Sequence, residues 1–545
     1  MNKTLLFNPI NMVHDKNVSV FKKFLPDWNM RCIYNSKFPW FSGENKRDSE
    51  EAFYFTNRYF KSIPKGAFDN VKAVILFTAQ LRIPPCNLIQ EAAMRSIPVI
   101  VVEEAYQMML EQGFVNNYFL PVDHLFAASD YERENFIKIG VPGDVVETTG
   151  CMLRYREPVP EDSSRADSLK KKLNIPADKP VATLCLASLS PSGETTEIRK
   201  ELLTCASRGL PDKYELLIKP HPYERDKNFH SFVRQYAPNA NIADPRISFD
   251  RILEISDIIL NRGNSQVIID AMQKGIPVAV IPTGRKTVFH GLLSEVVINE
   301  SKDLVRVVNT IKTKGRGIYN EMFQKYLSIT PEQAAENVTS RIKEIAEKQE
   351  LYRPEERLLE LALFWAWMGY DKQARRTLIN ARGRTGNHPL IEKISRLVSC
   401  KANRDEIAYL KEWCGDGYRQ WILQSLWIKT LYLTGKKMNS CEKDWLSNFP
   451  PRMNRSKFLN YAIFLYWCYE RSGMSEGGEV LLDKLYKEFS ALKNIERLKS
   501  QDSDKHNKFR FALHYFGEKF NHSTNLALKN FLWRAETLGR CTNRG

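Results

Sequence analysis

The chain has 545 residues, of which 43% are hydrophobic and 26% are charged, with a net charge of +16 at pH 7. This length exceeds one ordinary hydrophobic core and predicts about two to four domains of globular composition. No run of about 18 apolar residues is present, which argues against a membrane-spanning helix. The apolar stretch before Asn8 is too short for a signal peptide, so we expect a cytoplasmic protein.

The ten cysteines stand singly, and no C-x-x-C pair occurs anywhere in the sequence. Zinc sites and dithiol redox motifs use closely spaced cysteine pairs, so neither is supported. We expect reduced, mostly buried thiols and no metal site.

Strand-like and helix-like segments alternate over residues 1–155. Each expected strand is a short apolar run, and the helical segments carry apolar residues at helical spacing. In chain order, the expected strands are residues 3–10, 72–79, 97–105 and 123–129, and the expected helices are residues 18–25, 86–96 and 130–140. This alternation predicts βαβ units and an N-terminal Rossmann-like domain with a parallel sheet.

The alternation stops and then resumes. Residues 156–180 are rich in Pro, Ser, Asp and Lys, which predicts a linker with a short charged helix. A second Rossmann-like domain is expected over residues 181–345. Its expected strands are residues 180–188, 213–222, 256–263 and 276–282, and an expected helix spans residues 266–275.

No convincing strand pattern follows residue 350, and residues 350–545 are expected to form an all-α region of paired helices that resembles tetratricopeptide repeats. Residues 351–545 hold 34 Lys and Arg against 21 Asp and Glu, and 8 of the 10 tryptophans. The basic, aromatic-rich composition suggests a protein partner or peripheral contact with an anionic membrane. A solvated basic domain with core tryptophans explains it equally well.

The expected strand YELLI ends in Lys219, followed by His221 and Pro222. Proline explains why the strand ends, but turns are more often built from Gly, Asn, Asp or Ser than from Lys and His. Ligands of open α/β sheets bind outside the carboxyl ends of the strands. We therefore expect Lys219 and His221 to face an anionic ligand, although a surface turn would also fit the pattern.

The expected strand over residues 256–263 runs directly into a helix through Gly263, Asn264, Ser265 and Gln266. Backbone N–H groups at such a junction can bind a phosphate, and Asn264 or Ser265 could instead serve only as the helix cap. In the first domain, Glu103 and Glu104 follow an apolar strand. One of them could act as a general base.

These elements together resemble GT-B glycosyltransferases that use cytidine-activated donors. That group includes bacterial sialyltransferases, Kdo transferases and the glycerophosphotransferases of teichoic acid synthesis. The resemblance implies that His221-Pro222 is the phosphate-binding "HP" motif and that Asn264-Ser265 contacts phosphate. It also implies that Glu103-Glu104-Ala105 corresponds to an acidic-acidic-Gly motif, in which Ala105 departs from the family pattern.

The resemblance covers about residues 1–345 and implies an inverting, metal-independent glycosyltransferase without a cofactor. Glu104, or else Glu103, would be the base, and His14 lies at the edge of the expected cleft. Lys219, His221, Pro222 and residues 263–266 would hold a donor of the CMP-Kdo or CMP-sialic-acid type. The acceptor would be a capsular or lipopolysaccharide-type glycan at the inner face of the bacterial inner membrane.

Three other functions remain open. A UDP-sugar transferase or a nucleotide-sugar 2-epimerase would use the same architecture, and residues 97–150 also resemble the non-hydrolysing 2-epimerases. A non-catalytic scaffold would fit the alanine at position 105. Nucleic-acid binding would explain the charge, but no recognised reading module is present.

Overall fold

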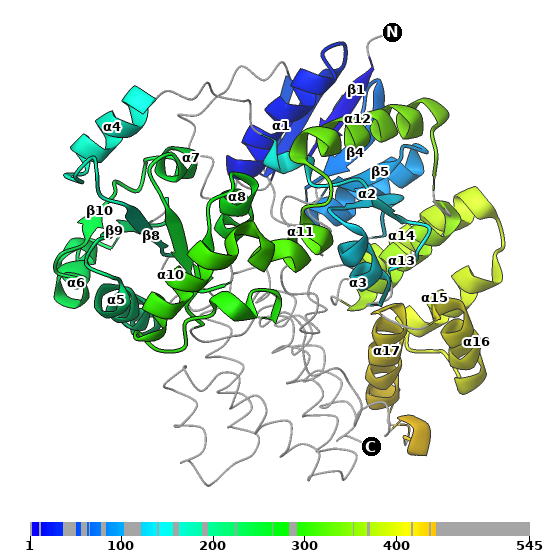
Figure 1. Cartoon of the computed structure of the whole chain (residues 1–545). Coiled ribbons are helices and arrows are strands. Elements are labelled where there is room, and N and C mark those ends of the chain that lie inside the picture. Colours follow the sequence, from blue (N-terminus) through cyan, green and yellow to red (C-terminus); the bar gives the residue numbers. More distant parts are fainter. Residues whose placement is uncertain are drawn as a thin grey trace.

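The computed structural model describes residues 3–442 of the chain, apart from several gaps. The gaps are residues 10–11, 36–50, 56–62, 65, 78–82, 103–120, 139–140, 156–162, 188–194, 223, 225, 264, 283–290, 352–353, 368–370, 416–417, 435 and 437. Within the described residues, the strands form a seven-stranded sheet and a five-stranded sheet. Figure 1 shows the two sheet domains beside each other, with a set of helices next to the first.

All paired strands of the first sheet are parallel, in the order β3-β2-β1-β4-β5-β6-β7. The strands are β1 (Thr4–Phe7), β2 (Asn29–Asn35), β3 (Glu51–Phe55), β4 (Val71–Leu76), β5 (Val99–Val102), β6 (His124–Ala127) and β7 (Val146–Thr148). The strand order reverses between β1 and β4. A ligand site is expected beyond the carboxyl ends of the strands at such a reversal.

Successive side chains of a strand point to opposite faces, and in the first sheet both faces are apolar. Leu5 and Ile75 belong to one core cluster, whereas Leu6 and Val74 belong to another on the opposite face. The helical elements of this domain are α1 (Met12–Phe24), α2 (Ile83–Met94), α3 (Asp130–Lys138) and the short η2 (Met152–Arg154). Both faces therefore need a cover of helices.

The second sheet is also parallel, in the order β10-β9-β8-β11-β12. Its strands are β8 (Val181–Cys185), β9 (Glu215–Lys219), β10 (Asn241–Ile242), β11 (Ile258–Asn261) and β12 (Val278–Val280). The helical elements that precede, connect or follow them are α4 (Ser163–Lys172), α5 (Thr196–Gly209), α6 (Phe229–Tyr236), α7 (Phe249–Leu253), α8 (Val267–Gln273), η3 (Ser294–Val296), α10 (Asp303–Lys314), η4 (Gly315–Tyr319) and α11 (Asn320–Tyr326). The strand order reverses between β8 and β11.

After the second sheet the chain returns to the first. Helix α12 (Pro331–Lys348) begins with a capping box at Thr330 and Gln333 and lies along the first sheet (Figure 1). Val338 and Ile342 are fully buried in the cluster that contains Leu5 and Ile75. The close approach of α12 requires a glycine at position 150, where a Cβ atom would lie 2.6 Å from the Cβ atom of Ala334.

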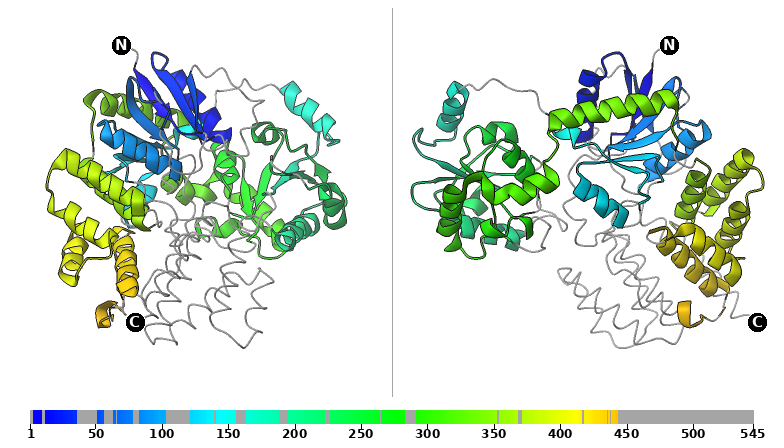
Figure 2. Two further views of the ribbon diagram at one scale, coloured as in Figure 1. Left: turned by 180° about the vertical axis from the view of Figure 1, so that it is seen from behind. Right: turned by 45° about the vertical axis from the view of Figure 1, so that its right-hand side comes forward.

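The chain then forms helices α13 (Pro354–Trp367), α14 (Asp371–Thr385), α15 (Pro389–Val398), α16 (Arg404–Cys414) and α17 (Tyr418–Thr434). We call these five helices the helical region. Their buried side chains belong to the same core cluster as the second face of the first sheet. Figure 2 shows them on the side of the first domain that faces away from the second domain.

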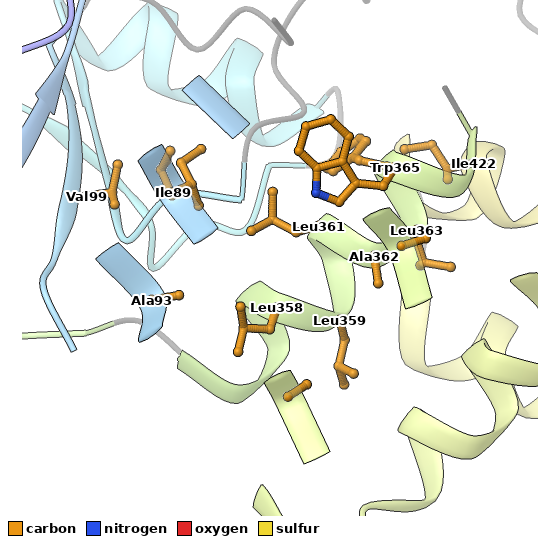
Figure 3. Close-up of a cluster of buried hydrophobic side chains, with 14 of the residues drawn as sticks. Ile89, Ala93, Val99, Leu358, Leu359, Leu361, Ala362, Leu363, Trp365 and Ile422 are labelled. Atoms are coloured by element: carbon orange, nitrogen blue, oxygen red, sulfur yellow. The ribbon is translucent and has the colours of Figure 1, made fainter. Parts of the chain in front are cut away.

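Helix α13 makes the contact between the helical region and the first domain. Leu358, Leu361 and Trp365 are at most 1% exposed, and Figure 3 shows Leu361 and Leu358 on the side of α13 that faces Ile89 and Ala93 of α2. Burying one large apolar side chain contributes about 1.5–3 kcal/mol. The helical region is therefore an integral cover of the first sheet and not a separate appendage.

A buried ion pair reinforces this contact. The Arg357 guanidinium of α13 donates to Asp123, which also accepts the backbone N–H of Val99 at 2.7 Å. The side chains of Asp123 and Arg357 are 0% and 2% exposed. Nearby, the hydroxyl of Thr377 in α14 donates to Oε1 of Gln90 in α2 at 3.0 Å. Asp123 is thus bonded from both α13 and β5, whereas Nε and Nη2 of the buried Arg357 have no hydrogen-bond partner among the described residues.

The described part of the chain confirms the predicted fold class of two parallel-sheet domains followed by helices. The tetratricopeptide-like character of the helices stays a prediction, and residues 443–545 lie outside the described part. Sequence reasoning did not identify β2, β3, β7 or β10. The predicted second domain, residues 181–345, includes most of α12, yet this helix packs on the first sheet. Within the predicted linker, Leu169 and Leu173 pack against the second sheet.

Removing one partner of the buried pair leaves the other charge unpaired in the interior, which costs about 3–5 kcal/mol. We expect Arg357→Met to lower the free energy of unfolding by about that amount, measured by urea unfolding. The control is Arg306→Met, which removes an exposed pair with Asp303 at 3.7 Å and should cost at most about 1 kcal/mol. Equal, small losses for both variants would contradict a structural role for the pair.

Candidate functional site

The carboxyl ends of β8, β9 and β11 meet at one edge of the second sheet. Cys185 of β8 is paired in register with Lys219 of β9, and Asn261 of β11 donates its side-chain N–H to the Cys185 carbonyl at 3.3 Å. The segments that follow Lys219 and Asn261 are thus about two strand spacings apart, roughly 10 Å. Two of the predicted binding segments, residues 219–222 and 263–266, therefore share this edge.

Lys219 is buried, and its ammonium group donates to the carbonyls of Pro220 and Pro245 at 2.9 and 3.0 Å. Burial lowers the pKa of this ammonium group below its ordinary value. Two of its three N–H donors therefore tie the end of β9 to the segment around residue 245. The third remains for a further acceptor, so Lys219 both shapes the turn and can bind an anion.

His221 is half-buried directly after this lysine. Its pKa is lowered from 6.5, first by burial and then by the positive charge of Lys219. The imidazole is consequently neutral at pH 7 and carries one N–H donor. Its backbone carbonyl accepts the N–H of Glu224 at 2.9 Å, which closes a turn that contains the exposed Pro222.

This turn is fixed by an ion pair that sequence reasoning missed. Arg199 of α5 donates to Oε2 of Glu224 and to the carbonyl of Ala187, both at 2.8 Å, and its side chain is 1% exposed. It thereby joins the segment after β8 to the turn after β9. Arg199 and Glu224 are 25 residues apart in the sequence, and no local pattern indicates that they meet.

The segment after β11 is held by Asn261. Its side-chain oxygen accepts the N–H of Gly263 at 2.9 Å, and Gly263 has a φ of +81°, which favours glycine. The hydroxyl of Ser265 accepts the N–H of Val267 at 3.4 Å, and Gln266 immediately precedes α8. Asn264 lies outside the described residues. The structure thus accounts for Gly263 and Ser265 as residues that shape this turn.

The first domain presents its own edge. Asn8 follows β1 at the strand reversal. Its side-chain N–H donates to the carbonyl of Ile33 at 2.9 Å, and its backbone N–H donates to the carbonyl of Ile75 at 3.3 Å. Its side-chain oxygen is buried and has no hydrogen-bond partner among the described residues. This residue was not predicted, although an asparagine directly after a buried strand was a usable signal.

The predicted catalytic residues cannot be placed with the same detail. Glu103 and Glu104 lie outside the described residues, directly after β5 ends at Val102. His14 lies in the first turn of α1, and its side chain is also outside the described part. The catalytic assignment therefore stays a prediction that concerns the carboxyl edge of the first sheet.

The two domains are joined directly near the second site edge. Arg154 of η2 donates to both carboxylate oxygens of Asp270 in α8, at 3.3 and 3.2 Å. Tyr131 of α3 packs against Tyr326 of α11 with ring centroids 5.4 Å apart. Because α8 follows the turn at residues 263–265, the ion pair links that turn to the first domain.

Across the described residues, no group of three or more His, Cys, Asp or Glu side chains is placed to hold a metal ion. The same part of the chain contains no helix with the length and apolar character needed to cross a bilayer. The absence of a metal or cofactor from the reaction stays a prediction.

No family model matches the sequence, and no curated protein matches it. The structure is similar to that of the wall teichoic acid polymerase TagF, at 13% identity and a TM-score of 0.43 over 64% of this chain and 89% of that one. It is similar to a glycosyltransferase from Rickettsia africae, at 12% identity and a TM-score of 0.43 over 64% and 98%. It is also similar to a UDP-GlcNAc 2-epimerase from Neisseria meningitidis, at 13% identity and a TM-score of 0.42 over 63% and 100%.

The low pKa of His221 can be measured by NMR titration of the imidazole signals. We expect a midpoint below 6.5, and we expect Lys219→Met to raise it, because the variant removes the neighbouring positive charge. His230, an exposed histidine of α6, is the reference in the same spectra. A His221 midpoint at or above 6.5 in the unmodified protein would contradict the burial of this ring.

Proposed function

We propose that the protein is an inverting, metal-independent GT-B glycosyltransferase that uses a cytidine-activated sugar, of the CMP-Kdo or CMP-sialic-acid type. The supporting observation is the shared edge of the second sheet, where β9 ends at Lys219 and the segments after β9 and β11 carry His221 and Gly263. A cation, a neutral imidazole and a glycine turn on one sheet edge suit a nucleotide phosphate. The acceptor is a surface polysaccharide or a glycolipid.

The donor nucleotide lies on the second domain in this proposal. The remaining N–H of Lys219 and the imidazole N–H of His221 donate to the phosphate, and the turn at residues 263–266 completes its contacts. The Arg199–Glu224 pair keeps the His221 turn in place, because its two side chains are buried and joined at 2.8 Å. These residues also stabilise the charge that develops on the departing nucleotide phosphate.

The first domain supplies the base. Glu104 accepts the proton of the acceptor hydroxyl while its oxygen attacks the anomeric carbon, and the bond from that carbon to the donor phosphate breaks with its electron pair on the nucleotide. One displacement without an enzyme nucleophile inverts the anomeric configuration. Ala105 stands where the resembling family has glycine, so the backbone at this base is more restricted than in that family.

Calorimetric titration with CMP, CDP, UDP and GDP tests the donor class. We expect cytidine nucleotides to bind selectively and His221→Ala to weaken that binding about tenfold or more, since a hydrogen bond to a charged group contributes about 1.5–3 kcal/mol. His230→Ala is the matched control and should leave the affinity unchanged.

The other outcomes of this titration are equally informative. Preference for UDP would replace the cytidine donor by a UDP-sugar, used by a transferase or a 2-epimerase. A protein that binds none of the four nucleotides would be a non-catalytic scaffold, and the proposed function would be wrong.

The role of the base is tested separately from binding. We expect Glu104→Gln to retain the affinity for the nucleotide, because the carboxylate lies on the other domain, and to lower turnover of the donor sugar at least about a hundredfold. Release of free nucleotide from the donor measures turnover, with Glu103→Gln as the control. Loss of turnover in the Glu103 variant alone would assign the base to Glu103.

A further inference from the structure

The outer face of helix α14 carries four exposed cations around one exposed apolar side chain. Lys372, Arg375, Arg376 and Arg382 are all exposed, together with Ile379. They are spaced by three or four residues or stand next to one another, so they lie along one side of the helix. We call these five residues the α14 face.

The opposite side of α14 holds the helix in position. Ala374, Leu378 and Ala381 are buried in the core shared with the first sheet. Arg384 donates to the backbone carbonyl of Ala93 and to the hydroxyl of Ser96 at 2.6 Å. The helix therefore cannot turn its cations inward, and the α14 face is presented to solvent by the packing of the fold.

The side chains of the four cations of the α14 face make no ion pair and no hydrogen bond with another of the described residues. The sequence of α14, DKQARRTLINARGRT, has one acid, Asp371, at its first position. Helix α10 is different, because Lys302, Arg306 and Lys314 pair with Glu300, Asp303 and Glu295. The α14 face is thus a cluster of like charges without acids to neutralise it, which fits an anionic partner.

Ile379 indicates which kind of anionic partner fits. Its 70% exposure exceeds that of the other exposed large apolar side chains in the described part, which reach 46% at Val305. An aliphatic side chain that projects between arginines gains little from a nucleic-acid backbone, which offers it phosphates. At a lipid surface the same side chain can enter the acyl boundary while the guanidinium groups contact lipid phosphates.

We infer that the α14 face binds the surface of a bilayer that contains anionic phospholipid. The inference rests on the proposed function in one respect, since it names the surface at which the proposed transferase meets a membrane-associated acceptor. The first domain, which would hold that acceptor, shares its core with α14. Membrane binding by α14 would therefore position the acceptor side of the molecule.

Co-sedimentation of the full-length protein with vesicles tests the inference. We expect binding to vesicles of phosphatidylcholine and phosphatidylglycerol, weak binding to phosphatidylcholine alone, and a decrease with increasing salt. The triple variant Arg375→Glu, Arg376→Glu, Arg382→Glu should lower the ratio of bound to free protein about tenfold or more. Ile379→Ser should lower the fraction that remains bound at high salt.

The matched control is Arg306→Glu, Lys312→Glu, Lys314→Glu on α10, which changes the net charge equally and also replaces exposed side chains. It should retain most of the vesicle binding, and circular dichroism of both variants should match that of the unmodified protein. Equal loss in both variants, or unmodified protein that binds single-stranded RNA but not the vesicles, would overturn the inference. Nucleotide binding by the α14 variant should be unchanged, so the two proposals fail separately.

Discussion

The constraint on which the structure depends is the burial of both faces of the first parallel sheet. Its strands place apolar side chains on each face in alternation, so a helical cover on one side alone would leave the other exposed. Helices α1 and α12 cover one face, and α2 with the helical region covers the other. The return of the chain from the second domain and the docking of α13 both follow from this requirement.

Much of the fold was predictable because its central strands are continuous apolar runs, as β4, β5, β9 and β11 show. Strand β2, with the sequence NMRCIYN, contains an arginine and two asparagines and gave no such signal. Its Arg31 is nevertheless buried, because the guanidinium donates to the backbone carbonyl of Asp69 at 2.7 Å. The docking of the helical region was equally hidden, since apolar periodicity shows that a helix has a buried face but not what covers it.

The candidate site also contains residues that the sequence predicted and residues that it did not. Lys219 and His221 were found because they are unusual at the end of a buried strand, and the structure explains the lysine by its two carbonyl contacts. The residues that hold this edge together, Arg199 and Glu224, meet across a long sequence separation. Such pairs depend on tertiary geometry, which single-residue patterns do not contain. The catalytic carboxylates, Glu103 and Glu104, rest on their position after an apolar strand and on the family resemblance, and they lie outside the described residues.

The shared core also determines which parts of the molecule can move. The first sheet, α12 and the helical region form one packed unit, because one face of the sheet shares a core cluster with α12 and the other face shares one with the helical region. The core cluster of the second sheet also includes Ala128 and Cys151 of the first domain, and the Arg154–Asp270 ion pair joins the two domains near α8. A domain opening that separates η2 from α8 would break this pair. Such an opening would move the second domain relative to the first sheet. Helix α14 would keep its position, because it shares a core cluster with that sheet.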